Sequence, residues 1–215
     1  MKVDIRDRNA MAHAAAEMDA VVHTAYVQSD SEAIVRGTAA AAEAAQGKRF
    51  VHLSSDIVFD GTRGRYREDD PPAPINEYGR AKTEAERRAT EIHGAPTLVR
   101  TSLIYGGAEP GPQERLAAGA TRFFVDEFRS PVQVTDLAGA IVELLSLDVA
   151  GPLHLAGADD VSRYDFAVLL GADRERIEGV ATTPDRCPNV TLDSSLAASF
   201  LGTRLRGVYE VLSGA

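Results

Sequence analysis

Short apolar runs alternate along the chain with alanine-rich stretches that are long enough to form helices. The apolar runs predict strands at residues 3–5, 20–25, 49–54, 97–101 and 153–155. The inner runs are apolar nearly throughout, as strands are when both faces of a sheet are covered. The pattern therefore predicts an α/β fold, with a doubly wound parallel sheet and helices on both of its faces.

The alanine-rich stretches predict helices at residues 8–17, 31–45, 77–92, 136–147 and 163–170. Several of them begin after a side chain that can cap a helix: Asp30 or Ser31, Asn76 and Thr135. Glycine and proline mark two long loops, at 56–75 and 105–122. Because α/β sheets bind ligands beyond the carboxyl ends of their strands, we expect these loops to form the walls of a site.

Charge and cysteine content exclude several classes of function. The formal net charge is −9, whereas a protein that binds nucleic acid needs a basic face. Cys187 is the single cysteine, so no internal disulfide can form, and the five histidines show no metal-binding spacing. The first residues do not resemble a signal peptide, and no apolar run approaches the ~20 residues of a membrane span. We therefore expect a cytoplasmic protein with no nucleic-acid partner, no membrane partner and no structural metal.

Tyr78 and Lys82 stand four residues apart in a predicted helix, which places both side chains on one helix face. A free phenol has a pKa of about 10, but a nearby ammonium group lowers that pKa by stabilising the phenolate. Ser55 follows a buried strand, from which its hydroxyl can reach the carboxyl edge of the sheet and orient a carbonyl group. Ser55, Tyr78 and Lys82 are therefore the candidate catalytic residues.

The Tyr-x-x-x-Lys pair alone has a second interpretation, an amphipathic helix that exposes its lysine and half-buries its tyrosine. With six tyrosines and three lysines, chance would produce such a pair about 0.08 times. The order of further segments decides between the two interpretations. These segments are 4–7 (DIRD), 21–26 (VVHTAY), 53–61 (LSSDIVFDG), 99–106 (VRTSLIYG), 128–138 (FRSPVQVTDLA) and 151–157 (GPLHLAG). In these segments and their order, the sequence resembles the extended short-chain dehydrogenase/reductase family, and most closely its dTDP-4-dehydrorhamnose reductase branch.

The resemblance implies a role for each candidate residue. Tyr78 would be the proton donor, Lys82 would lower the pKa of Tyr78 and contact the nicotinamide ribose, and Ser55 would take the role of the family's serine or threonine. The cofactor would be NADP or NAD, and the substrate a nucleotide-linked 4-keto sugar. The resemblance also implies that residues at two strand ends, together with Tyr78 and Lys82, bind the cofactor: Asp4, Ile5, Thr24 and Ala25.

The resemblance also implies how the chain divides into domains. Residues 1–150 would form a Rossmann domain with a substrate-side insertion at about 105–130, and residues 151–215 a small C-terminal substrate-binding lobe. The family opens with a strand and a Gly-x-x-Gly-x-x-Gly loop that holds the cofactor's pyrophosphate at a helix N-terminus. This sequence shows no such segment, so we expect an N-terminally truncated Rossmann fold with weakened cofactor binding.

The strand at 20–25 then becomes an edge of the sheet, and an apolar edge invites pairing. Three outcomes are open for it: the natural chain is longer, the strand at 3–5 closes directly onto it, or two chains cover each other's edges in a homodimer.

Two functions follow from the resemblance. The first is an NAD(P)H-dependent reductase or epimerase that acts on a nucleotide-linked 4-keto sugar. The second is a catalytically impaired, regulatory or binding member of the family, since the branch includes the regulatory subunit of methionine adenosyltransferase. Ile34, Ile57 and Leu103 replace residues that the branch usually carries, which weakens the case for dTDP-4-dehydrorhamnose itself but leaves the reaction class.

A nucleotide-linked substrate also needs groups that bind phosphate. Arginine suits this task because its planar guanidinium group can donate two parallel hydrogen bonds to phosphate oxygens. Three arginines are candidates for that contact: Arg122, Arg129 and Arg186. The alternative for each of them is an ordinary surface ion pair.

Overall fold

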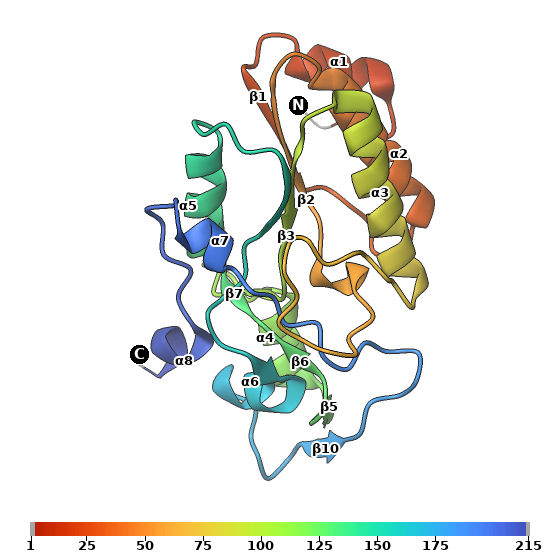
Figure 1. Cartoon of the computed structure of the whole chain (residues 1–215). Helices are drawn as coiled ribbons and strands as arrows, with labels where there is room; N and C mark the ends of the chain where they lie inside the picture. Colours follow the sequence, from red (N-terminus) through yellow and green to blue (C-terminus); the bar gives the residue numbers. More distant parts are fainter. Residues whose placement is uncertain (1–2, 214–215) are drawn as a thin grey trace.

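The computed structural model describes residues 3–213, and a four-stranded sheet runs through its centre (Figure 1). The strands are β1 (Ala20–His23), β2 (Arg49–Leu53), β3 (Thr97–Arg100) and β8 (Gly151–His154). They lie in the order β1-β2-β3-β8, and every neighbouring pair is parallel. The four carboxyl ends therefore meet at one edge of the sheet, which is where such folds bind their ligands.

Helices cover both faces of this sheet (Figure 1). On one face, α2 (Ser31–Ala44) and α3 (Glu77–His93) pack against each other, and α1 (Arg8–Ala15) packs against α2. On the other face lie α5 (Val134–Leu144) and the short α7 (Ser195–Ala198). The predicted α/β class, with a parallel sheet between two layers of helices, is confirmed.

The core is split by the sheet into two layers. Because side chains alternate across a strand, Phe50 packs against α2 and α3, whereas Val51 packs against α5. Both side chains are fully buried. Phe50 contacts the small side chains of Ala41 and Ala89, which allow the two helices to lie close to the sheet. Burial on both faces is the reason that the inner strands are apolar nearly throughout.

The predicted helices and the inner strands all exist, with ends that differ from the prediction by a few residues. Asp30 and Asn76 cap α2 and α3 as predicted, each accepting a backbone N–H at 2.8 Å. The cap predicted at Thr135 is wrong. Thr135 lies inside α5, and the side chain of Gln133 accepts the first free N–H groups of that helix.

The strand predicted at 3–5 is wrong. The segment forms a turn in which the backbone N–H of Asp7 donates to the carbonyl of Asp4 at 3.0 Å, and Asp7 then caps α1. Ile5 packs on α2 beside Gly37, where an added Cβ would come within 2.6 Å of the Ile5 Cδ1 atom. Turn and cap chemistry at two aspartates therefore outweighs the short apolar run. Among the described strands β1 is an edge, and the outcome in which 3–5 closes onto it is wrong.

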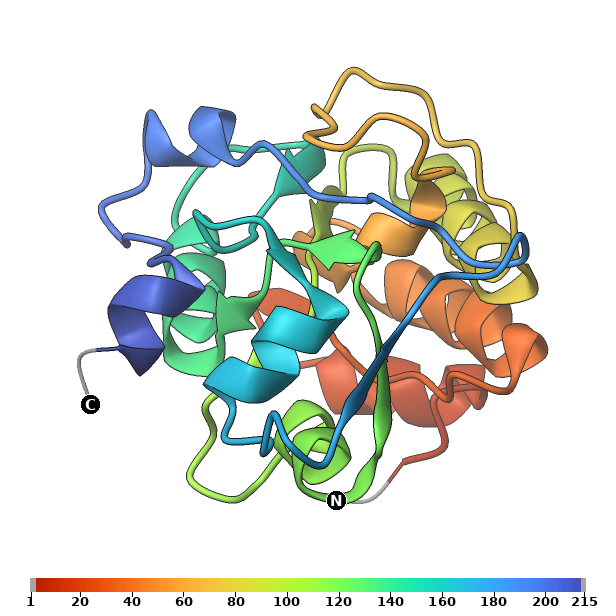
Figure 2. The ribbon, with the colours of Figure 1, turned by 90° about the horizontal axis from the view of Figure 1, so that it is seen from below.

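A smaller lobe lies beyond the carboxyl edge of the sheet (Figures 1 and 2). Its elements are two helices and short strands in pairs: α4 (Pro112–Gly119), α6 (Arg163–Leu169), β4 (Ile104–Tyr105) with β7 (Val132–Gln133), β5 (Arg122–Phe124) with β10 (Glu178–Val180), and β6 (Phe128–Arg129) with β9 (Val161–Ser162). The segment 105–122, predicted as a loop, thus contains α4, which begins at Pro112 because proline suits the first turn of a helix.

The lobe draws on two stretches of the chain rather than on one. The residues after 150 first complete the sheet as β8, then contribute β9, α6 and β10 to the lobe, and end in α8 (Val208–Leu212). The division into domains at residue 150 stays a prediction. What the fold shows is that 104–133 and 161–180 together face the carboxyl edge of the sheet.

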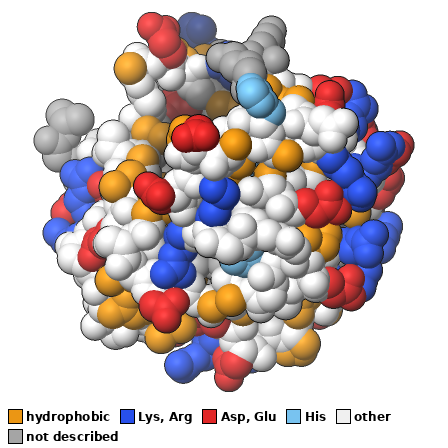
Figure 3. All heavy atoms as spheres, turned by 90° about the horizontal axis from the view of Figure 1, so that it is seen from above, with side chains coloured by type: hydrophobic (Ala, Val, Ile, Leu, Met, Phe, Trp, Pro, Cys, Tyr) orange, Lys and Arg blue, Asp and Glu red, His pale blue; other side chains and the backbone are white. Residues whose placement is uncertain are grey.

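Charges of both signs mix on the end of the molecule that carries α1 (Figure 3). Exposed ion pairs account for part of this pattern, among them Arg8 with Glu43 at 3.2 Å. Within residues 3–213, no helix is both long and apolar enough to cross a membrane.

Candidate active site

The structure brings Ser55, Tyr78 and Lys82 together at the carboxyl edge of the sheet. Ser55 directly follows β2 and caps a short 3-10 helix, η1 (Asp56–Val58). Tyr78 lies in the first turn of α3, and Lys82 follows one turn later. The Lys82 ammonium donates a hydrogen bond to the carbonyl of Leu53 at 3.0 Å, which fixes it beside the end of β2.

Ser55 and Tyr78 line a cavity of about 630 Å³, which we call the edge cavity. Its walls come from η1, from α3, from the 102–114 segment with the start of α4, and from β6 and α6 of the smaller lobe. The predicted loop at 105–122 thus contributes residues from its first half to the wall, whereas the loop at 56–75 contributes only Asp56 and Ile57. The cavity therefore lies between the sheet and the lobe, where a substrate can contact both.

Burial controls the ionisation of Tyr78 and Lys82. The pKa of Tyr78 is raised, first by burial and then by the neighbouring Tyr26, while a hydrogen bond with Ser55 acts in the opposite direction. Burial lowers the pKa of Lys82 to about 8, against the attraction of Glu86. The net shift at Tyr78 is opposite to the lowering that the resemblance implies, because burial outweighs the effect of nearby charge. At neutral pH Tyr78 keeps its proton and can act as an acid.

Tyr26 is a site residue that the sequence reasoning missed. It follows β1 and lines the edge cavity. Its ring lies 6.0 Å from the ring of Tyr78, and the ammonium of Lys82 lies 4.5 Å from its centroid. It adjoins Thr24 and Ala25, both in the exposed loop after β1, so the strand end implied to run along the cofactor does lie beside Tyr78 and Lys82.

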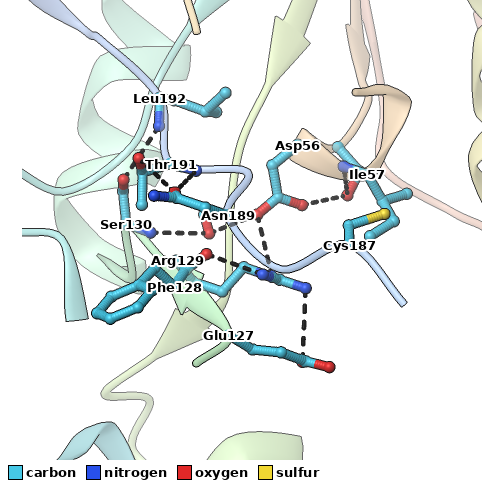
Figure 4. Close-up of polar contacts among 12 residues, drawn as sticks. Asp56, Ile57, Glu127, Phe128, Arg129, Ser130, Cys187, Asn189, Thr191 and Leu192 are labelled. Carbon is cyan, nitrogen blue, oxygen red and sulfur yellow. Dashed lines mark hydrogen bonds and ion pairs between the residues drawn. The ribbon is translucent and has the colours of Figure 1, made fainter. Parts of the chain in front are cut away.

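Asp56 lines the edge cavity and lies between η1 and Arg129 (Figure 4). The hydroxyl of Ser55 donates to one carboxylate oxygen of Asp56 at 3.0 Å, and that of Ser102 donates to the other at 2.7 Å. The guanidinium group of Arg129 lies 4.0 Å away. Asp56 is buried, and burial raises its pKa although Arg129 and both hydroxyl groups act to lower it.

Three arginines line the lobe side of the edge cavity together with the buried Glu127, and Figure 4 shows Arg129 beside the Glu127 carboxylate. Arg186 binds both oxygens of Glu127, one of them at 2.9 Å, and Arg129 lies at 3.6 Å. Arg163 donates to Gln113 at 3.0 Å, and its pKa is lowered to about 10 by burial and by the nearby Arg129. Arg129 and Arg186 are paired with carboxylates, whereas the described side-chain partner of Arg163 is the neutral Gln113, so Arg163 is the guanidinium group here that suits an anionic ligand.

The predicted phosphate contacts stay a prediction, but the structure shows which of the three candidate arginines lie at the cavity. Arg129 and Arg186 line the cavity, but Arg122 does not; it lies on β5 with 67% of its side chain exposed and pairs with Glu178. Arg163 was missed because its neighbours lie far away in the sequence. Only the fold brings its α6 helix next to Arg129 and Arg186.

The three positions that depart from the branch lie in or beside the site. Ile57 and Leu103 line the edge cavity. Ile34 is buried on α2 and packs against Ala81 and Ala85 of α3, on either side of Lys82 in the sequence. Each of them can therefore change the shape of the cavity or the support of the lysine.

The residues present fit the nicotinamide end of a cofactor. The phenol of Tyr78 lines the cavity near the carboxyl ends of β1 and β2, and the buried ammonium of Lys82 lies next to it, covered by the ring of Tyr26; once uncovered, the two form a donor set that ribose hydroxyls can use. Asp4 and Ile5 lie elsewhere, in the turn before α1, where Asp4 pairs with Arg6 at 2.9 Å. Their role in binding the cofactor stays a prediction.

The RmlD substrate binding domain family matches residues 1–189, nearly the whole of this chain. The chain belongs to this family. It is 35% identical over 152 residues to dTDP-4-dehydrorhamnose reductase of Mycobacterium tuberculosis, an alignment that covers 63% of the chain and 50% of the relative. It is 29% identical over 179 residues to the methionine adenosyltransferase 2 subunit beta of Pongo abelii, covering 74% and 52%. The chain thus spans about half the length of these curated relatives.

The fold of the RmlD family is also seen in solved structures. A crystal structure of dTDP-4-dehydrorhamnose reductase from Bacillus anthracis, in complex with NADP, superimposes with a TM-score of 0.83. The match covers 98% of this chain and 84% of that one at 24% identity. The predicted Rossmann-type fold is confirmed. The predicted branch is confirmed as membership of the RmlD substrate binding domain family.

Proposed function

We propose that this protein reduces the keto group of a nucleotide-linked 4-keto sugar with NADPH or NADH. The observation that carries the proposal is the arrangement of the edge cavity. The hydroxyl groups of Ser55 and Tyr78 line one wall, and Arg129, Arg163 and Arg186 line another. The hydroxyl groups of the first wall can bind and protonate a keto group. The guanidinium groups of the second wall can bind the diphosphate of a nucleotide sugar. The similarity to the reductase of M. tuberculosis supports the same assignment.

The roles of the residues follow from their protonation. When bound, the nicotinamide cofactor supplies the hydride. The raised pKa of Tyr78 keeps its proton in place until negative charge develops on the sugar oxygen, and Tyr78 then donates that proton. Ser55 would hold the carbonyl by turning its hydroxyl, which donates to Asp56 in this structure, toward the sugar oxygen. The ammonium of Lys82, one helical turn from Tyr78, stabilises the phenolate that remains.

The arginine wall would hold the diphosphate of the substrate. Arg163 is suited to this because its described partner is the neutral Gln113 rather than a carboxylate. The deeply buried Arg129 is held by Asp56 and Glu127, so it would contribute charge more than new hydrogen bonds. Arg186 is likewise held by its hydrogen bonds to the Glu127 carboxylate, so it too would contribute charge more than new hydrogen bonds.

A second function is favoured by one comparison and one contact. The methionine adenosyltransferase subunit matches the larger share of this chain, and Tyr26 covers the ammonium that a cofactor would need. A binding or regulatory role, without turnover, would use the same fold. A cytoplasmic location and a homodimer both stay predictions.

The test measures the oxidation of NADPH and of NADH by absorbance in the presence of dTDP-4-dehydrorhamnose. We expect turnover that falls about 10²-fold or more in Tyr78→Phe, because the proton donor is lost. Tyr164→Phe, a change of the same kind outside the edge cavity, is the matched control and should keep the rate. Binding of cofactor without turnover in the unaltered protein would instead favour the regulatory role.

A further inference from the structure

The ring of Tyr26 packs against the ammonium group of Lys82. The ammonium lies 4.5 Å from the centroid of the Tyr26 ring, a distance at which a cation is attracted to an aromatic face. The same ring lies 6.0 Å from Tyr78 at an interplanar angle of 33°. Tyr26 thus bridges the two residues of the Tyr-x-x-x-Lys pair from the opposite side of the site.

Lys82 has no open route to the edge cavity. Its side chain is 3% exposed and, unlike Tyr78 and Tyr26, it is not among the residues that line the cavity. The Leu53 carbonyl holds the ammonium from the sheet side. The ring of Tyr26 therefore lies between the ammonium and the space from which a ligand would approach.

Tyr26 itself is placed where it can move. Its residue is 47% exposed, and it sits in a stretch at 24–30 that has no helix or strand and is exposed over most of its length. The hydrogen bonds that anchor this stretch lie after Tyr26, where Asp30 closes a turn with Val27 and caps α2. A rotation of the tyrosine would break its contacts with Lys82 and Tyr78 but leave that anchor intact.

We propose that Tyr26 is a reversible cover over Lys82, which closes the lysine to ligands from the cavity and must swing aside before the ammonium can bind a hydroxyl-bearing ligand. The cover itself follows from the contacts of this chain. That the ligand is the ribose of a nicotinamide nucleotide rests on the proposed function. The cover would make cofactor binding depend on the fraction of molecules in which Tyr26 is open.

The first arm of the test measures access to Lys82 without any cofactor. An amine-reactive acylating reagent labels the full-length protein near pH 8, and peptide mass spectrometry follows the labelling of Lys82 against that of Lys48 as an internal reference. Because the pKa of Lys82 is about 8, a large share of the amine is neutral and reactive, so access limits its rate. The variants are Tyr26→Ala, which removes the ring, and Tyr26→Phe, which keeps it.

We expect Lys82 to be labelled about tenfold faster in Tyr26→Ala than in the unaltered protein, if the cover is closed about nine-tenths of the time. Tyr26→Phe should react at the unaltered rate, because the ring and not the hydroxyl covers the ammonium. An unchanged Lys48 rate shows that the fold is intact, and Tyr26→Leu replaces the alanine variant should that one unfold. Equal Lys82 labelling with and without the ring overturns the proposal.

The second arm titrates NADPH into the same variants by calorimetry. A cover that competes with the cofactor predicts a tighter dissociation constant in Tyr26→Ala, by the same factor as the gain in labelling. Faster labelling with no binding in any variant would keep the cover and reject the proposed function. Faster labelling with tighter binding supports both.

Discussion

Arg100 and Glu86 form a buried, two-pronged ion pair directly behind the candidate site. The Arg100 guanidinium donates to the two carboxylate oxygens at 3.1 and 2.8 Å, and the two side chains are only 2% and 6% exposed. The pair joins β3 to α3, and Glu86 lies one turn after Lys82 on that helix. It therefore ties α3 to the sheet and adds negative charge near Lys82.

Removal of one partner should destabilise the fold. We expect Glu86→Gln to lower the free energy of unfolding by about 3–5 kcal/mol, because it leaves the buried charge of Arg100 without a counter-charge. Glu84→Gln, which breaks an exposed pair with Arg87 on the same helix, should cost less than about 1 kcal/mol. Urea unfolding of the two variants makes the comparison. Similar losses in both would show that the buried pair contributes little.

Gly79 sets the distance between α3 and η1, and with it the approach of Tyr78 to Ser55. A Cβ at Gly79 would come within 2.4 Å of the Ile57 carbonyl oxygen, which is backbone and cannot rotate away. We expect Gly79→Ala to lower the free energy of unfolding by about 1–3 kcal/mol, although alanine is the better helix former by about 1 kcal/mol.

The matched control is Gly119→Ala at the end of α4, where an added Cβ meets no atom within 4 Å. It should be neutral or slightly stabilising. A thermal or urea unfolding curve for each variant checks the difference in sign. If Gly79→Ala proves as stable as Gly119→Ala, η1 does not pack as tightly on α3 as the contact implies.

The candidate site was predictable to the extent that local pattern determines position. A helix puts Tyr78 and Lys82 on one face, and a buried strand delivers Ser55 to the edge of a sheet, whatever the remainder of the chain does. The cavity behind them was not predictable in this way. Glu127 and Arg186 meet across 59 residues, and Tyr26 reaches α3 from the end of a different strand. Contacts between residues so far apart in the chain leave no periodic pattern in the sequence.

The one wrong strand shows how local chemistry can mislead. Val3 and Ile5 have the composition of a strand, but a strand forms only where another strand can pair with it, and the aspartates at 4 and 7 offer the backbone a turn and a helix cap instead. The helix cap predicted at Thr135 was wrong for a related reason. The longer side chain of Gln133 accepts the hydrogen bonds of the first N–H groups of α5.

Arg163 should matter for the binding of a nucleoside diphosphate. We expect Arg163→Gln to weaken the binding of dTDP about tenfold or more, the loss of a charged hydrogen bond worth about 1.5–3 kcal/mol. Arg122→Gln, on the exposed β5 strand, is the control and should change the dissociation constant less than about twofold. Calorimetric titration of dTDP into both variants measures this, and an equal effect of the two would place the diphosphate away from the arginine wall.

Lys82 should make stability depend on pH in the alkaline range. Burial lowers its pKa from 10.5 to about 8 in the folded protein, whereas the unfolded chain keeps the ordinary value. Between these two values the unfolded state binds more protons, so the free energy of unfolding should rise as the pH is raised from about 8 toward 10. Below about pH 8 both states are protonated, and the full cost of burying the charge is present.

Lys82→Met isolates this contribution because it keeps an unbranched side chain and removes the amine. We expect a flatter dependence of stability on pH across that range, and a more stable protein at neutral pH, by about 1.4 kcal/mol for each pH unit of the shift and less where the lost hydrogen bond to Leu53 offsets it. Lys48→Met, which removes a lysine far from the site, should keep the slope of the unaltered protein. Parallel profiles for the unaltered protein and Lys82→Met would mean that the ammonium is solvated in solution, which would also reject the closed position of Tyr26 above it.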